Sequence, residues 1–202
     1  KTLLQSLFTN NLDKLTPGRA LYGLFCDEKG GVIDDLIIYQ LGEADAGIKP
    51  AATTEGGEYF ICVNAVNRDA DFKWLRDRAN GSVALNDLSD DSAQFAVLGP
   101  LAAAIVGGVL GPATTGLKYF GCAKVNWKGE SILVTRTGYT GEDGYELYLP
   151  EGAAEPLWEA LLKTGKPQGL APIGLGARDS LRIEMGYALY GQEIDDTITP
   201  FE

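Results

Sequence analysis

Two adjacent carboxylates interrupt an otherwise apolar stretch, "GGVIDDLIIYQ", in which Asp34 and Asp35 follow the turn at Gly30-Gly31. Successive side chains of a strand point to opposite faces, so these two acids are expected on opposite faces. At least one should then lie near the core or a cavity, where burial raises the pKa of a carboxyl and suits it to acid–base work. A structural interpretation stays open, in which one Asp closes the hairpin turn and the other pairs with an arginine.

A second candidate is the segment "TRTGYTGEDGYELYLP", which places Gly138, Gly141 and Gly144 at three-residue intervals. Glycines let backbone groups come close to a ligand. The segment is not a phosphate loop, because it lacks a Lys-Ser/Thr ending and carries two acids. A plain turn with solvated acids is the alternative. The strand that follows carries Glu146, whose carboxylate can accept two hydrogen bonds from an amidine-like edge such as a 2-amino-pyrimidinone ring.

A third candidate is "GLGARDSLRIEMG", where Arg178 and Arg182 stand four residues apart on one helix face. Surface salt bridges explain at least one of the two more simply.

The composition narrows the chemistry. The 202 residues carry a net charge of -11, which argues against nucleic acid or an anionic membrane as the main partner. Histidine is absent, which removes His-dependent triads and His-containing zinc sites. No metal-binding spacing accompanies the three cysteines, Cys26, Cys62 and Cys122, which are expected as reduced thiols in a cytoplasmic protein. We expect no signal peptide, and the 202 residues contain no apolar run long enough to span a bilayer.

The elements that must position these residues follow from periodicity and turn signals. We expect helices over 1–15, 67–79, 101–110, 152–165 and 175–186, hairpins over 19–42 and 118–138, strands at 58–65 and 145–149, two short strands within 82–100, and a surface insertion over 42–57. Since most strands join by hairpins, the predicted class is α+β, with antiparallel or mixed sheets and packed helices. The order of the elements suggests two lobes, over residues 1–99 and 100–202.

Taken together, the motifs resemble a known family. The stretches "GGVIDDLIIY", "FICVNAVNRDADFKWL", "RTGYTGEDGYEL", "ARDSLRIEMGYALYGQEID" and "TPFE" resemble, in this order and spacing, the aminomethyltransferase (T-protein) of the glycine cleavage system. The resemblance covers nearly all of the chain, and "RTGYTGEDGYE" is its most family-specific part.

The resemblance implies a reaction and a site. Such an enzyme takes an aminomethyl group from the lipoyl arm of H-protein and delivers the one-carbon unit to tetrahydrofolate, with release of ammonia and no metal. Carried over by motif, Asp35 is implied to activate or orient the attacking folate nitrogen, and Glu146 to hold the pterin edge. Arg178 is implied to contact the same ring system, and Asn64 and Tyr139 to line the pocket.

The chain departs from the family at both ends. Members begin further upstream and continue into a separate C-terminal β-barrel domain, so this chain is expected to be a fragment, and its activity alone stays open. A folate-dependent demethylase, or the folate module of a dimethylglycine or sarcosine oxidising enzyme, is the alternative. The iron–sulfur assembly type is disfavoured, because "MGYALYGQE" lacks the cysteine of that group's "KGCYxGQE". A purely structural role would leave Asp35 and Glu146 unexplained.

Overall fold

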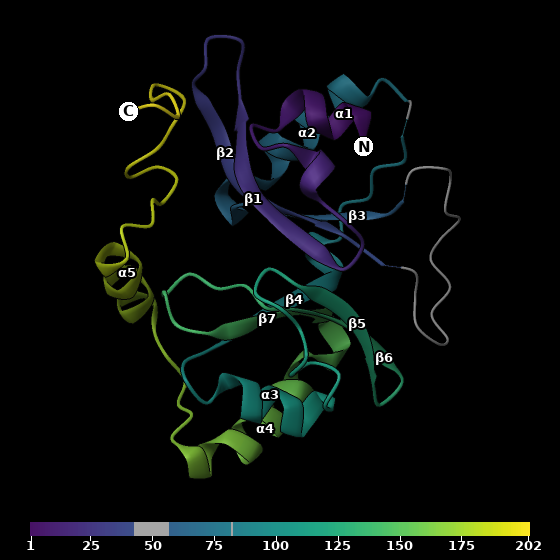
Figure 1. Cartoon of the computed structure of the whole chain (residues 1–202), viewed down its shortest axis with the longest axis vertical. Coiled ribbons are helices and arrows are strands. Elements are labelled where there is room, and N and C mark those ends of the chain that lie inside the picture. The colour runs from purple at the N-terminus through teal and green to yellow at the C-terminus, as the bar shows by residue number, and fades with distance from the viewer. Residues whose placement is uncertain (43–56, 82) are drawn as a thin grey trace. The chain divides into compact units, whose positions relative to one another are not determined.

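The chain folds as two units, each an antiparallel sheet with packed helices (Figure 1). This computed structural model describes residues 1–42, 57–81 and 83–202. The first unit contains the described residues up to Asp87 together with Ala188–Glu202, and the second contains Leu88–Tyr187. The predicted α+β class with two lobes is confirmed. The division differs from the one expected after residue 99, and most of the insertion expected at 42–57 lies outside the described residues.

The first unit is built on the predicted hairpin. Strands β1 (Arg19–Cys26) and β2 (Val32–Gln40) pair antiparallel, and β3 (Tyr59–Cys62) adds to the free side of β2. Gly30 takes the turn at φ 92°, which favours glycine. Two short helical segments precede the sheet, α1 (Thr2–Leu7) and the 3-10 turn η1 (Leu12–Lys14). After β3 come the 3-10 turn η2 (Ala65–Asn67) and helix α2 (Arg68–Ala79).

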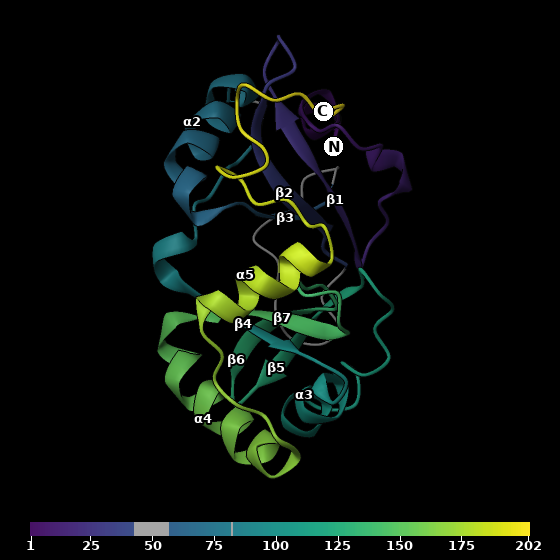
Figure 2. The same cartoon turned by 90° about the vertical axis from the view of Figure 1, so that its left-hand side faces the viewer.

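The core of this unit lies among α1, η1, the hairpin and α2. It contains eight buried residues: Leu4, Phe8, Leu12, Leu15, Phe25, Leu36, Ile38 and Leu75. The C-terminal segment Ala188–Glu202, drawn in yellow, returns to the start of β2 (Figure 2). There the Val32 amide donates to the carbonyls of Asp195 and Ile198, at 3.1 Å each. A Cβ at Gly31 would collide with the carbonyl of Asp196, so glycine permits this approach.

The second unit holds a four-stranded sheet in the order β4-β7-β6-β5. Its elements are η3 (Ser89–Asp91), β4 (Ser92–Leu98), α3 (Ala102–Leu110), β5 (Cys122–Trp127), β6 (Glu130–Thr135), β7 (Gly144–Pro150), η4 (Glu151–Ala153), α4 (Ala154–Gly165), η5 (Lys166–Gln168) and α5 (Leu175–Glu184). The hairpin expected over 118–138 is confirmed by β5 and β6, and it turns at Lys128-Gly129, with φ 53° and 96°. Of the two short strands expected within 82–100, only β4 forms, so that prediction was wrong for residues 83–88. Residues 83–88 pair with neither sheet, and Asp87 forms an ion pair with Arg68 at 2.9 Å.

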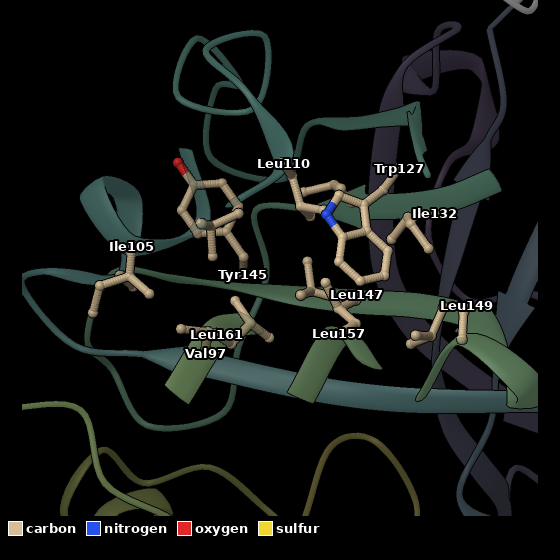
Figure 3. Close-up of a cluster of buried hydrophobic side chains, with 14 residues drawn as sticks. Val97, Ile105, Leu110, Trp127, Ile132, Tyr145, Leu147, Leu149, Leu157 and Leu161 are labelled. Atoms are coloured by element: carbon tan, nitrogen blue, oxygen red, sulfur yellow. The ribbon is translucent and has the colours of Figure 1, made fainter. Parts of the chain in front are cut away.

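Helices α3 and α4 pack beside this sheet over a second core (Figure 3). Tyr145, Leu147 and Leu149 of β7 point into it, together with Leu157 and residues of α3. The opposite face of β7 carries Gly144, Glu146 and Tyr148, which are also buried. β7 is therefore buried on both faces, unlike a strand with one solvated side.

Candidate functional site

A buried carboxylate organises the polar residues of the first unit. Asp34 is completely buried on β2. Its Oδ2 accepts a hydrogen bond from the Asn64 amide at 2.9 Å, and its Oδ1 accepts from Nδ2 of Asn64 at 2.9 Å and from Nδ2 of Asn67 at 2.7 Å. These three donors compensate the burial of the charge. The strand therefore fixes the position of Asn64 through Asp34.

Asp35, the predicted catalytic residue, lies next to this carboxylate and shares its amide partner. Nδ2 of Asn64 donates to Oδ1 of Asp35 at 2.7 Å, and the Tyr22 hydroxyl donates to Oδ2 at 3.2 Å. Burial raises the pKa of Asp35 most, and the neighbouring charge of Asp34 raises it further, while the hydrogen bonds from Asn64 and Tyr22 lower it. A half-buried carboxyl with a raised pKa is suited to accept a proton.

The spacing of the donors explains why they converge on β2. Asn64, Asn67 and Asp71 follow one another at intervals of three and four residues through η2 and the start of α2, which places them on one helical face. The sequence analysis singled out Asn64 but missed Asn67 and Asp71. The polar residues at helical spacing in "NAVNRDAD" are the signal that would have found them.

Asp71 is buried without a donor. Its side chain is 1% exposed, and among the described residues neither carboxyl oxygen receives a hydrogen bond. Burial raises its pKa to about 9, with a further contribution from the adjacent carboxyl of Asp34, which lies within hydrogen-bonding reach. An ionised carboxylate at this position would receive no compensating hydrogen bond from the described residues.

Glu146, in the second unit, is a buried carboxylate held by neutral donors. It is 8% exposed at the middle of β7. Its Oε1 accepts from Nε2 of Gln94 at 3.0 Å, and its Oε2 accepts from the Thr137 hydroxyl at 2.5 Å. Since the single proton of Thr137 is used there, the Thr135 hydroxyl donates in turn, 2.7 Å from that of Thr137. Thr135, Thr137 and Gln94 were not foreseen from the sequence.

The glycine-rich loop before β7 is closed by an ion pair. The Arg136 guanidinium donates two hydrogen bonds to Asp143, at 2.8 Å each, and a third to the Leu117 carbonyl at 2.7 Å. This pair lowers the pKa of Asp143. Gly141 has φ 79°, and Gly144 lies where a Cβ would sit 2.8 Å from Cα of Leu98. The loop thus depends on its glycines for conformation and close packing.

An aromatic and cationic group lies at this loop and α5. The Arg178 guanidinium stacks over the ring of Tyr139, 4.6 Å from its centroid, and the ring of Tyr187 stacks on Tyr139 at 5.7 Å. Arg182, by contrast, is buried and donates to Asp179 at 2.8 Å and to the Tyr187 carbonyl at 3.2 Å. The salt-bridge interpretation therefore applies to Arg182, and Arg178 is the arginine that lies with Tyr139.

The structure brings the predicted site residues together in two sets. Asp35 and Asn64 meet in the first unit, and Tyr139 and Arg178 meet in the second, which also holds Glu146. Within the described part of the chain, no group of three or more His, Cys, Asp or Glu side chains is arranged to hold a metal ion. The helices of that part include none long and apolar enough to cross a membrane.

Comparison with known proteins gives a consistent result. The family described as the GCVT N-terminal domain matches residues 1–202. The chain is 46% identical over 200 residues to an aminomethyltransferase of Geobacillus kaustophilus and 43% identical over 201 residues to one of Clostridium botulinum; each match covers 98% of this chain and 51% of the relative. The crystal structure of glycine cleavage system aminomethyltransferase T from Bartonella henselae matches with a TM-score of 0.80 and 32% identity, over 98% of this chain and 49% of that one. The chain thus spans about half the length of the curated relatives it matches.

Proposed function

Because this chain belongs to the GCVT N-terminal domain family, we propose that it supplies the folate-binding and catalytic residues of a glycine cleavage aminomethyltransferase. The reaction would move the one-carbon unit from the aminomethyl-lipoyl arm of H-protein to tetrahydrofolate, with release of ammonia. The names of the relatives and of the structural neighbour support this activity. A transient complex with lipoylated H-protein and a cytoplasmic location belong to the same proposal.

The arrangement around Glu146 is the observation that carries the folate proposal. Each of its oxygens accepts one hydrogen bond from a neutral protein group, Gln94 or Thr137. A carboxylate oxygen has two acceptor positions, so the donors among the described residues leave one position open on each oxygen. Two parallel acceptor positions match the paired N–H groups of an amidine-like edge, which the pterin ring of a folate presents. The open acceptor positions of Glu146 therefore match the N–H groups of this ring.

Asp35 would accept the proton released when a folate nitrogen attacks the aminomethyl carbon. The bound folate supplies the nucleophilic nitrogen, and the chain needs only to orient it and provide one base. Asn64 and Tyr22 fix the direction of the Asp35 carboxylate. Its raised pKa makes it a stronger base than an exposed aspartate. No histidine is required, in accord with a chain that has none.

Arg178 and Tyr139 would extend the ligand-binding surface. Their stacked arrangement offers a flat cationic and aromatic face, which suits a planar heterocycle or its polar substituents. The ring of Tyr187 stacks on the ring of Tyr139 and supports its position. This part of the proposal concerns affinity and not proton transfer.

A calorimetric titration with a stable reduced folate tests the proposal. The protein, its Glu146→Gln variant and a Glu142→Gln control are compared; Glu142 lies exposed in the neighbouring loop. Saturable binding that Glu146→Gln weakens at least about tenfold, and that the control retains, supports the pterin contact, since a charged hydrogen-bond acceptor contributes about 1.5–3 kcal/mol. Equal affinity of all three proteins would remove Glu146 from the site.

A product assay distinguishes this activity from the demethylase alternative. Methylene-tetrahydrofolate should form from aminomethylated H-protein, but not from dimethylglycine or sarcosine.

A further inference from the structure

Asp71 and Asp34 form a pair of buried carboxyls with an unequal supply of donors. Asp34 accepts three N–H hydrogen bonds, whereas neither oxygen of Asp71 receives one from the described residues. N–H donors suit a carboxylate, which only accepts, and a carboxyl without donors is satisfied only when it carries a proton and donates it. Asp71 lies one helical turn after Asn67, whose amide donates to Asp34 at 2.7 Å, so the acceptor beside Asp71 is Asp34.

We propose that Asp71 carries the proton of this pair and donates it to Asp34, and that Asp71 thereby acts as a positioning residue for Asn64 and Asp35. The contact sequence runs from Asp71 to Asp34, then through Nδ2 of Asn64 to Oδ1 of Asp35. Asp34 thus holds the same amide that orients the proposed base. The inference about Asp35 rests on the proposed function, but the location of the proton does not.

The surroundings favour a single negative charge on the pair. Among the described residues, the titratable groups that interact with the pair include Asp35 of β2 and Tyr190 of the C-terminal segment. Tyr190 is in turn influenced by Asp195 and Asp196, and Tyr22 of β1 donates to Asp35. Each of these groups is an acid. Burial raises the pKa of Tyr190, and the charges of Asp196 and Asp34 raise it further, so its hydroxyl keeps its proton. A second charge on Asp71 would lie beside the Asp34 carboxyl and would receive no hydrogen bond from the described residues, which disfavours its ionisation.

Carbon-13 NMR of the protein labelled at the aspartate carboxyl carbons locates the proton directly. At pH 7 the Asp71 signal, assigned by its loss in Asp71→Asn, is expected at the shift of a protonated carboxyl and should move only as the pH approaches 9. Asp77, exposed on the same helix and paired with Lys73, serves as the control and should titrate in the acid range. An Asp71 signal that titrates with that of Asp77 would overturn the proposal. This outcome is independent of any enzymatic activity.

Two substitutions test the positioning role. Asp71→Asn keeps a neutral donor toward Asp34, and Asp71→Leu removes the donor at similar volume. The leucine variant is expected to lower kcat about ten- to a hundredfold with KM for folate changed less than about threefold, because a misplaced base slows the reaction more than it weakens binding. The asparagine variant should restore kcat and keep the amide resonances of the Asn64 side chain, which the leucine variant should shift.

The other possible results for the Asp71 variants also decide whether Asp71 donates its proton to Asp34. If Asp71→Asn, while folded, fails as Asp71→Leu does, the donor is not what matters and the proposal is wrong. If Asp71→Leu does not fold, the Asn64 resonances and the acid limb of the kcat profile in Asp71→Asn still test it, since both should match the unmodified protein. If the unmodified protein shows no aminomethyl transfer, the proposed function fails, while the Asp71 and Asn64 signals still decide where the proton lies.

Discussion

The hydroxyl of Thr137 donates a 2.5 Å hydrogen bond to Oε2 of Glu146, and thereby links the start of the glycine-rich loop to the middle of β7. Thr137 is 2% exposed, so water does not replace this donor when it is removed. We expect Thr137→Val, which preserves the shape of the side chain, to lower the free energy of unfolding by about 1–3 kcal/mol, the cost of a buried charged acceptor that loses a donor. Denaturant unfolding measures the change.

Thr137→Ser is the matched variant, because it keeps the hydroxyl and loses only a methyl group. It should recover most of the stability and most of the folate affinity that Thr137→Val loses. If Thr137→Val is as stable as the unmodified protein while Thr137→Ser is destabilised, packing of the threonine methyl accounts for the contribution of Thr137, and the hydrogen bond to Glu146 is unimportant.

Replacement of the proposed base should separate catalysis from binding. Asp35→Asn is nearly isosteric and keeps an acceptor for Asn64, but it cannot take a proton. We expect kcat to fall by about 10²–10⁴, with folate affinity measured by calorimetry changed little. The remaining activity should lose the acid limb of its pH profile, which in the unmodified protein lies above the range of an ordinary aspartate because the pKa of Asp35 is raised. A large loss of affinity with unchanged turnover would contradict the role of Asp35.

Gly144 tests the close packing of β7 against β4. A Cβ at this position would lie 2.8 Å from both Cα of Leu98 and the carbonyl oxygen of Val97, and backbone atoms cannot move aside cheaply. We expect Gly144→Ala to cost about 1–3 kcal/mol of stability, as other overpacked substitutions do. Gly152→Ala is the control, because a Cβ there meets nothing within 4 Å. Equal unfolding midpoints for the two variants would show that the strands separate without strain.

Local patterns predicted the fold better than they predicted the contacts of the site. The hairpin turns at Gly30 and Lys128-Gly129 and the αL residue Asn80 that ends α2 depend on nearby residues, which a sequence displays directly. The same holds for the helices, except that the helix expected over 1–15 is divided into α1 and η1, because Phe8 is extended. The boundary between the units did not follow from such signals. It depends on which strand β4 pairs with, and on the return of Ala188–Glu202 to β2, both of which are long-range contacts.

Asp34 and Asp35, the two acids of "IDDL", also show that local patterns do not predict long-range contacts. Alternation along β2 correctly indicated that one of them is buried, and Asp34 is that residue. It did not show that one amide, that of Asn64, reaches both carboxylates, because the contact joins segments about thirty residues apart. Nor did it reveal Asp71, whose importance comes from burial beside another acid and not from its residue type.

The buried proton of Asp71 should make the free energy of unfolding depend on pH, in a range where few other groups of the chain titrate. In the unfolded chain Asp71 ionises near its ordinary value of about 3.9, whereas in the folded chain its pKa is about 9. Between these values the folded state binds one more proton than the unfolded state. The stabilising contribution is therefore present in full at low pH and is lost as pH rises toward 9, with a slope of at most about 1.4 kcal/mol per pH unit.

Asp71→Asn removes this titration while it keeps the donor. Since the chain contains no histidine, few groups other than Asp71 are expected to titrate between pH 5.5 and 8, and the raised pKa of Asp35 is common to both proteins. We expect the free energy of unfolding to fall more steeply with pH in the unmodified protein than in the variant, as measured by urea unfolding at several pH values. Asp77→Asn should follow the unmodified protein, because the pKa of Asp77 is lowered by Lys73 and the residue is ionised in both states across this window. Parallel curves for the unmodified protein and Asp71→Asn would mean that Asp71 is ionised in the folded protein, and a cation or donor would then have to be sought beside it.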